Sequence, residues 1–175
     1  MANAIVVKSR VMAQDVNALN RTGKINAEVK NGQVFTCGEC VGSVYALTKA
    51  TNAVKDVWMA HSPEVVLTGG MFLGLDKDPR NFSIQANKPV DIFKLAVGDT
   101  ITVTADFFKA VGNIPDGSKK VVELDASGDF VALASATGSY AGLSLKVVEE
   151  TYVVIATGAI GADRVKAWKL EVTQN

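Results

Sequence analysis

Residues 94–108 have the sequence KLAVGDTITVTADFF, and this stretch decides the fold class of the chain. A Gly98-Asp99 turn leads into a segment in which apolar and polar residues alternate strictly. One face carries Ile101, Val103, Ala105 and Phe107, and the other carries Thr100, Thr102, Thr104 and Asp106. This period of two predicts a β-strand with one face in the core and the other in water.

Similar segments, rich in Val, Ile, Thr and Ala and separated by turn residues, follow from residue 32 to the C-terminus. They predict strands at 33–36, 41–47, 57–60, 90–93, 120–124, 130–134, 143–149, 151–156 and 164–172. Short strands at this spacing are typical of an all-β protein, mostly an antiparallel barrel or sandwich. We expect an irregular, loop-rich N-terminal part with at most one or two short helices.

Details of individual segments remain open at the sequence level. A strand is expected at 4–7, and Val11–Asn20 is either a short helix or a loosely ordered arm. Glu149-Glu150 marks either a hairpin tip or the solvent face of one long strand, and we favour the long strand. The last strand changes phase, which predicts a β-bulge near Ala167-Trp168.

The turn-rich character of the first half suggests a division near residue 85. Residues 1–85 are expected to form an irregular region with short strands and an arm, and residues 86–175 a compact β-barrel or sandwich domain. The position of this boundary is not sharply defined, because Asn87-Lys88-Pro89 is too short for a flexible linker between domains.

Charge and composition exclude several classes of function. Lys and Arg total 18, as do Asp and Glu, and the basic residues are scattered. Nucleic-acid binding is therefore not expected, since phosphate contacts require clustered basic residues. No secretory signal or apolar run of roughly 18 residues is visible, so we expect a soluble protein made in a cytoplasm. Zero net charge favours a surface that meets other subunits.

Cys37-Gly38-Glu39-Cys40 is the clearest candidate for chemistry. Its two thiolates form half of a tetrahedral zinc site, which His61 and one carboxylate would complete. A redox role requires a helix N-terminus, whereas here the context is strand, turn, strand. The interpretation that we favour is a tight connection between strands whose two cysteines are reduced. No metal or cofactor is therefore expected.

Other motifs are weaker. His61 has neither a nucleophile nor an orienting carboxylate in a suitable place, which favours a structural histidine at a strand end. Asp76-Lys77-Asp78 starts like a calcium loop, but Arg80 stands where a third oxygen ligand is needed. Trp58 and Trp168 lie in apolar runs and are expected in the core. No catalytic residues are assigned, and we do not expect an enzyme.

Three segments together resemble small virion proteins of tailed bacteriophages, described as capsid decoration or head-stabilisation proteins. They are residues 57–65 (VWMAHSPEV), residues 82–88 and residues 93–103 (FKLAVGDTITV), so the resemblance covers roughly 40–110. It implies a non-enzymatic protein on the capsid surface, made in the bacterial host cytoplasm. Its implied partners are the major capsid protein and copies of itself, with no nucleic acid and no membrane. The N-terminal arm and the loop 68–81 are the expected contacts.

Alternative functions remain at this stage. A tail-tube or head-tail connector component would also use a β-barrel, but would form rings and project long hairpins. A small β-barrel module that binds a carbohydrate or another ligand is a third possibility, and an enzyme using Cys37 or Cys40 is a fourth.

Overall fold

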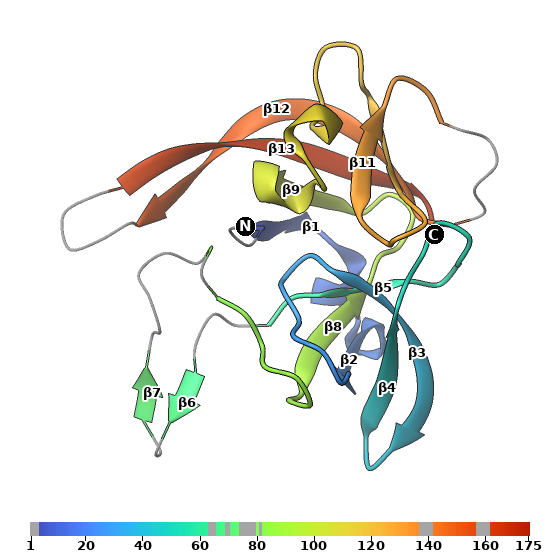
Figure 1. Cartoon of the computed structure of the whole chain (residues 1–175), viewed down its shortest axis with the longest axis vertical. Helices are drawn as coiled ribbons and strands as arrows, with labels where there is room; N and C mark the ends of the chain where they lie inside the picture. The colour runs from blue at the N-terminus through green and yellow to red at the C-terminus, as the bar shows by residue number, and fades with distance from the viewer. Residues whose placement is uncertain are drawn as a thin grey trace.

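The computed structural model describes residues 4–62, 66–68, 71–73, 80, 82–136, 142–156 and 162–175. In these residues the chain is almost entirely β-structure, with helical turns of the 3-10 type only, which confirms the predicted all-β class (Figure 1). One sheet has the order β1 (Val6–Arg10), β9 (Thr100–Thr104), β13 (Ala162–Gln174), β12 (Ser144–Ala156), β10 (Val121–Leu124) and β11 (Phe130–Leu133). A closed barrel has the order β2 (Asn20–Lys24), β4 (Val44–Lys49), β3 (Val34–Val41), β5 (Trp58–Ala60) and β8 (Val90–Lys94).

The remaining described elements are short. A separate pair of antiparallel strands consists of β6 (Val66–Thr68) and β7 (Met71–Leu73). The 3-10 turns are η1 (Met12–Gln14), η2 (Asn17–Leu19), η4 (Ala105–Phe107) and η5 (Val111–Asn113). Residues 11–20 therefore hold two 3-10 turns rather than an α-helix. The β2–β4 pair is parallel, and the other strand pairs described here are antiparallel.

β9 lies inside the sheet between β1 and β13, and both of its faces are covered. Ile101 and Val103 are fully buried, as the alternation predicts. The polar face was expected in water, and this prediction is wrong for Thr104 and Thr102, which are 0% and 9% exposed, whereas Asp106 is exposed. The backbone N–H of Ile5 donates to Thr104 Oγ1 (3.1 Å), so the segment entering β1 satisfies the buried hydroxyl. β9 also ends earlier than predicted, since Ala105–Phe107 forms η4.

Two hydrophobic clusters hold the described residues together. The larger one joins the inner face of the sheet, including Leu145, Trp168 and Leu170, to barrel residues such as Met59 and Phe93. The smaller one fills the barrel interior and contains Phe35, Leu47, Trp58, Val90 and Ile92. Both tryptophans are core residues, as predicted. Because the larger cluster draws on both bodies, the barrel and the sheet share a core.

The two bodies interleave along the chain. β1 belongs to the sheet and pairs with β9, whereas β8 belongs to the barrel and pairs with β2 and β5. The expected division into residues 1–85 and 86–175 therefore does not coincide with the division between barrel and sheet. The closed barrel is built mostly from the region expected to be irregular.

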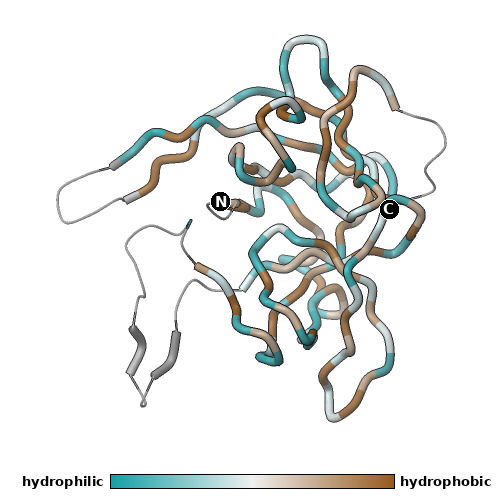
Figure 2. The backbone as a smooth tube through the Cα atoms, in the orientation of Figure 1, coloured by the Kyte–Doolittle hydropathy of each residue, from teal (hydrophilic) through white to brown (hydrophobic). Residues whose placement is uncertain are grey.

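β12 and β13 form a long antiparallel ribbon that projects from the sheet (Figure 1). β12 passes through Glu149-Glu150 without interruption, which confirms the single long strand. Hydrophobic and hydrophilic residues largely alternate along residues 164–172 of β13, whereas residues 153–156 of β12 form a continuous hydrophobic run (Figure 2). The bulge predicted at Ala167-Trp168 is wrong, because β13 pairs with β9 in continuous register there. The register shifts instead at two other points: Val148 of β12 is an extra residue between the pairs Val147–Leu170 and Glu149–Lys169, and Thr173 of β13 is one between Ser144–Gln174 and Leu145–Val172.

Candidate functional site

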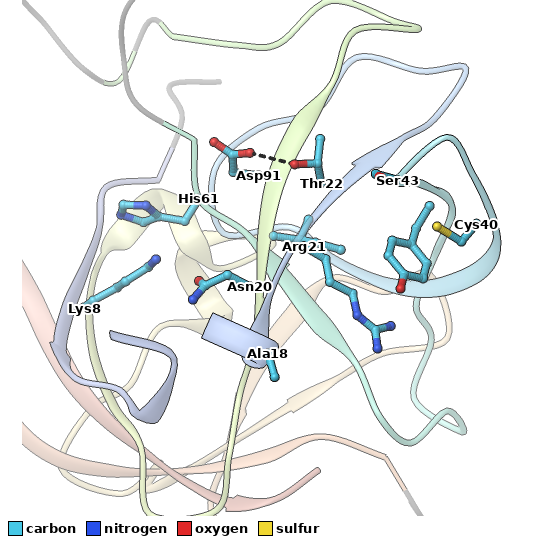
Figure 3. Close-up of a pocket in the computed structure, with 11 residues that line it drawn as sticks. Lys8, Ala18, Asn20, Arg21, Thr22, Cys40, Ser43, His61 and Asp91 are labelled. Atoms are coloured by element: carbon cyan, nitrogen blue, oxygen red, sulfur yellow. Dashed lines mark hydrogen bonds between the residues drawn. The ribbon is translucent and has the colours of Figure 1, made fainter. Parts of the chain in front are cut away.

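An open groove of about 1030 Å³ lies where β1 meets the barrel strands β2 and β8. Its polar side chains come from segments far apart in sequence and are spread along the groove, from Lys8 and His61 at one end to Ser43 and Cys40 at the other (Figure 3). The charged and polar residues that line it include Lys8, Asn20, Arg21, Thr22, His61 and Asp91. A concave site with convergent polar groups is the default place for ligand binding.

Lys8 carries the positive charge at one end of the groove. Its Nζ lies 4.3 Å from the ring centroid of Phe93, a cation–π contact with a buried aromatic ring. Burial lowers the pKa of Lys8, and the nearby carboxylate of Asp91 raises it in part. Asp91 in turn accepts a hydrogen bond from Thr22 Oγ1 (3.4 Å). The ammonium group is therefore partly desolvated but remains accessible from the groove.

His61 connects β1 to the barrel. Its Nε2 lies 3.0 Å from the carbonyl oxygen of Val6 and acts as the donor, since the carbonyl only accepts. Its backbone N–H donates to the carbonyl of Asp91 (2.9 Å). Burial, followed by the charge of Lys8, lowers the pKa of His61. At neutral pH the imidazole is therefore uncharged, with Nε2 engaged in a structural hydrogen bond.

Arg21 holds the other charged end of the groove. Its guanidinium lies 4.4 Å from the ring centroid of Tyr45 and 4.2 Å from a ring centroid of Trp58. It also hydrogen-bonds the thiol of Cys37, whose pKa is raised by burial and lowered in part by this arginine. The aromatic contacts fix the guanidinium at the mouth of the barrel.

Cys37 and Cys40 are both free, and both lie within β3. The tight connection predicted at residues 37–40 is therefore wrong. The chain turns instead at Gly42-Ser43, where φ is +57° and +69°, as a two-residue hairpin of the primed type requires. Between Cys37 and Cys40 the strand carries a bulge opposite Ala46.

The residues considered for a metal site are Cys37, Cys40 and His61. Cys40 and His61 line opposite ends of the groove (Figure 3). In the part of the chain that the structure describes, no group of three or more His, Cys, Asp or Glu side chains is placed to hold a metal ion. Asp76-Lys77-Asp78 and most of the loop 68–81 lie outside the described residues.

Sequence reasoning missed the charged residues of the groove. Lys8, Arg21 and Asp91 belong to three strands, and no local motif contains two of them. One feature of the sequence could have indicated the groove, namely a charged residue inside an otherwise apolar strand. Asp91 in the segment 90–93 is such a residue.

Comparison of this chain with protein-family models, curated proteins and solved structures finds no match. Among the described residues, no helix has the length and hydrophobicity needed to span a membrane.

Proposed function

We propose that this chain is a non-enzymatic structural subunit of a tailed-bacteriophage virion that decorates the capsid. In this role it stabilises the head by contacts with the major capsid protein and with copies of itself. The phage assignment rests on the sequence resemblance across residues 40–110. The observation that supports a role in assembly is the projecting β12–β13 ribbon.

The outer part of the ribbon has the properties of a contact surface. Residues 152–156 and 162–166 pair only with each other among the described strands, so both backbone edges are open. Val154 is 69% and Tyr152 47% exposed. Open edges and exposed hydrophobic side chains favour pairing with another chain. A second subunit or the capsid shell would cover them.

Cross-strand pairs make the ribbon stiff. Arg164 lies 4.0 Å from the ring centroid of Tyr152, and Lys166 Nζ lies 2.8 Å from a carboxylate oxygen of Glu150. Each exposed pair contributes little alone, on the order of 1 kcal/mol or less. Together they hold the exposed residues on a preformed surface, which reduces the ordering cost of binding.

The proposal is tested with emptied capsids of the phage that encodes the chain. We expect the wild-type protein to cosediment with these capsids in many copies, and the double variant Tyr152→Ser/Val154→Lys to lose most of this binding. Val111→Lys is the matched control, because Val111 is 86% exposed but lies in η5, away from the ribbon. Absence of the protein from purified virions would overturn the proposal.

The ribbon also favours the second candidate, a tail-tube or head-tail connector component, since such subunits project long hairpins. This role predicts rings of defined size in solution, visible by light scattering and electron microscopy. A monomeric protein that binds capsids would favour decoration, whereas rings that bind no capsid would favour the tube or connector.

A further inference from the structure

The groove contains two cationic side chains, Lys8 and Arg21, that form no ion pair with a carboxylate of the described residues. Six other lysines in the described part of the chain form ion pairs: Lys49, Lys94, Lys109, Lys119, Lys166 and Lys169. Neither Lys8 nor Arg21 pairs with a described carboxylate within 4.0 Å. Lys8 is moreover half-buried, so its charge has lost part of its hydration, and the Phe93 ring and the more distant Asp91 carboxylate offset this only in part.

Polar uncharged groups and one acceptor surround Lys8. Asn20 donates one amide N–H to the carbonyl of Ala13 (2.6 Å), which leaves its second N–H for a ligand. The Asp91 carboxylate accepts from Thr22 and has remaining lone pairs for hydroxyl donors. Ser43 adds a hydroxyl at the far side of the groove (Figure 3).

The mixture of charges restricts the ligand. The Lys8 ammonium attracts an anionic group, whereas Asp91 disfavours a densely charged polyanion such as nucleic acid. A ligand with one carboxylate and several hydroxyls can bind both side chains, since its carboxylate pairs with Lys8 and its hydroxyls donate to Asp91. The volume of about 1030 Å³ is slightly above the usual range for small-molecule sites, roughly 300–1,000 Å³, so the groove has room for such a ligand.

We propose that the groove between β1 and the barrel binds a sugar acid, with Lys8 holding the carboxylate and Asp91 and Asn20 binding hydroxyls. The site adds a ligand-binding activity to the chain and does not depend on whether the protein assembles on a capsid. Arg21 provides a second positive charge for a longer saccharide.

The first experiment is an NMR titration of the full chain with D-glucuronate, and with D-glucose as its neutral counterpart. We expect glucuronate to shift the amide signals of residues 8, 20–22, 61 and 91, and to bind at least tenfold more tightly than glucose. Raising the NaCl concentration should weaken glucuronate binding, because an ion pair with a partly exposed ammonium is screened. Equal binding of the two sugars, or no shifts at the groove, would overturn the proposal.

Variants then test the two charged roles. Lys8→Met removes the ammonium group that lies over the Phe93 ring but keeps an unbranched side chain there, and it should weaken glucuronate binding at least tenfold, while Lys8→Arg should stay within about threefold. Lys146→Met, at an exposed position on β12, is the control and should bind as wild type. Asp91→Asn should lower the preference for glucuronate over acetate, which lacks hydroxyls. If Lys8→Met and Lys146→Met bind glucuronate equally well, Lys8 does not hold the carboxylate and the proposal fails.

Discussion

Gly23 is buried on the face of β2 that points into the barrel, where Leu47 occupies the space a side chain would need. A Cβ at Gly23 would lie 2.5 Å from Leu47 side-chain atoms. We therefore expect Gly23→Ala to destabilise the protein by about 1–3 kcal/mol, the usual cost of overpacking. Urea unfolding measures the change in the free energy of unfolding.

The control is Gly112→Ala, because a Cβ there meets no atom within 4 Å. Combining Gly23→Ala with Leu47→Val should recover part of the lost stability, since Val is shorter at the point of contact. Equal stability of the Gly23 and Gly112 variants would show that the barrel interior yields to an added methyl group.

Single residues also show how far sequence reasoning extends. The buried roles of Trp58, Trp168 and Ile101 follow from local apolar patterns, and the structure confirms them. The groove could not be predicted, because Lys8 and Asp91 are far apart in sequence and lie near each other only where β1 of the sheet packs beside β8 of the barrel. Thr104 was wrongly predicted to be exposed, because the alternation shows which side chains are polar but not which are buried. A threonine hydroxyl can be buried when it has a hydrogen-bond partner, as Thr104 has in the backbone N–H of Ile5.

At the scale of elements, the long strand β12 was predicted from the sequence, but the position of its bulge was not. Ala167 is 0% and Trp168 3% exposed, so both faces of β13 are buried at this point. Burial on both faces produces the same sequence pattern as a change of phase, so the sequence of β13 suggests an extra residue at a point where the strand contains none. The extra residue, Val148, lies in the neighbouring strand and is 48% exposed.

Deleting Val148 tests this assignment. Val147 and Glu149 would then be adjacent and would still face Leu170 and Lys169, which are themselves adjacent. We expect the outer pairs, such as Tyr152–Lys166, to keep their register while the local twist decreases. Interstrand backbone NOEs measure the register.

Deleting Thr151 is the comparison, because it removes a residue from a regular part of the ladder. A one-residue slip moves side chains to the opposite face, so Tyr152 should no longer lie opposite Lys166. Loss of the Tyr152–Lys166 pair in the Val148 deletion as well would contradict the assignment of the bulge.

At the scale of the whole molecule, the interleaving of barrel and sheet predicts how fragments behave. Residues 1–85 lack β8, which closes the barrel, and residues 86–175 lack β1, which pairs with β9. We expect neither fragment to unfold cooperatively alone, and a mixture of the two to regain native signals. Thermal circular dichroism and amide NMR spectra measure this. A cooperative transition of residues 86–175 alone would instead support the division suggested by the sequence.

The fully buried face of β9 has a consequence for synthesis of the protein on the ribosome. β1 is translated about 90 residues before its partner β9. The second partner of β9 is β13, which is translated later still and supplies Trp168 and Leu170 to the core around Ile101 and Val103. The nascent chain therefore exposes these apolar residues until residues 162–174 have been translated. Pairings so distant in sequence fold slowly, so the exposed apolar residues of incomplete chains favour aggregation when many copies are made at once.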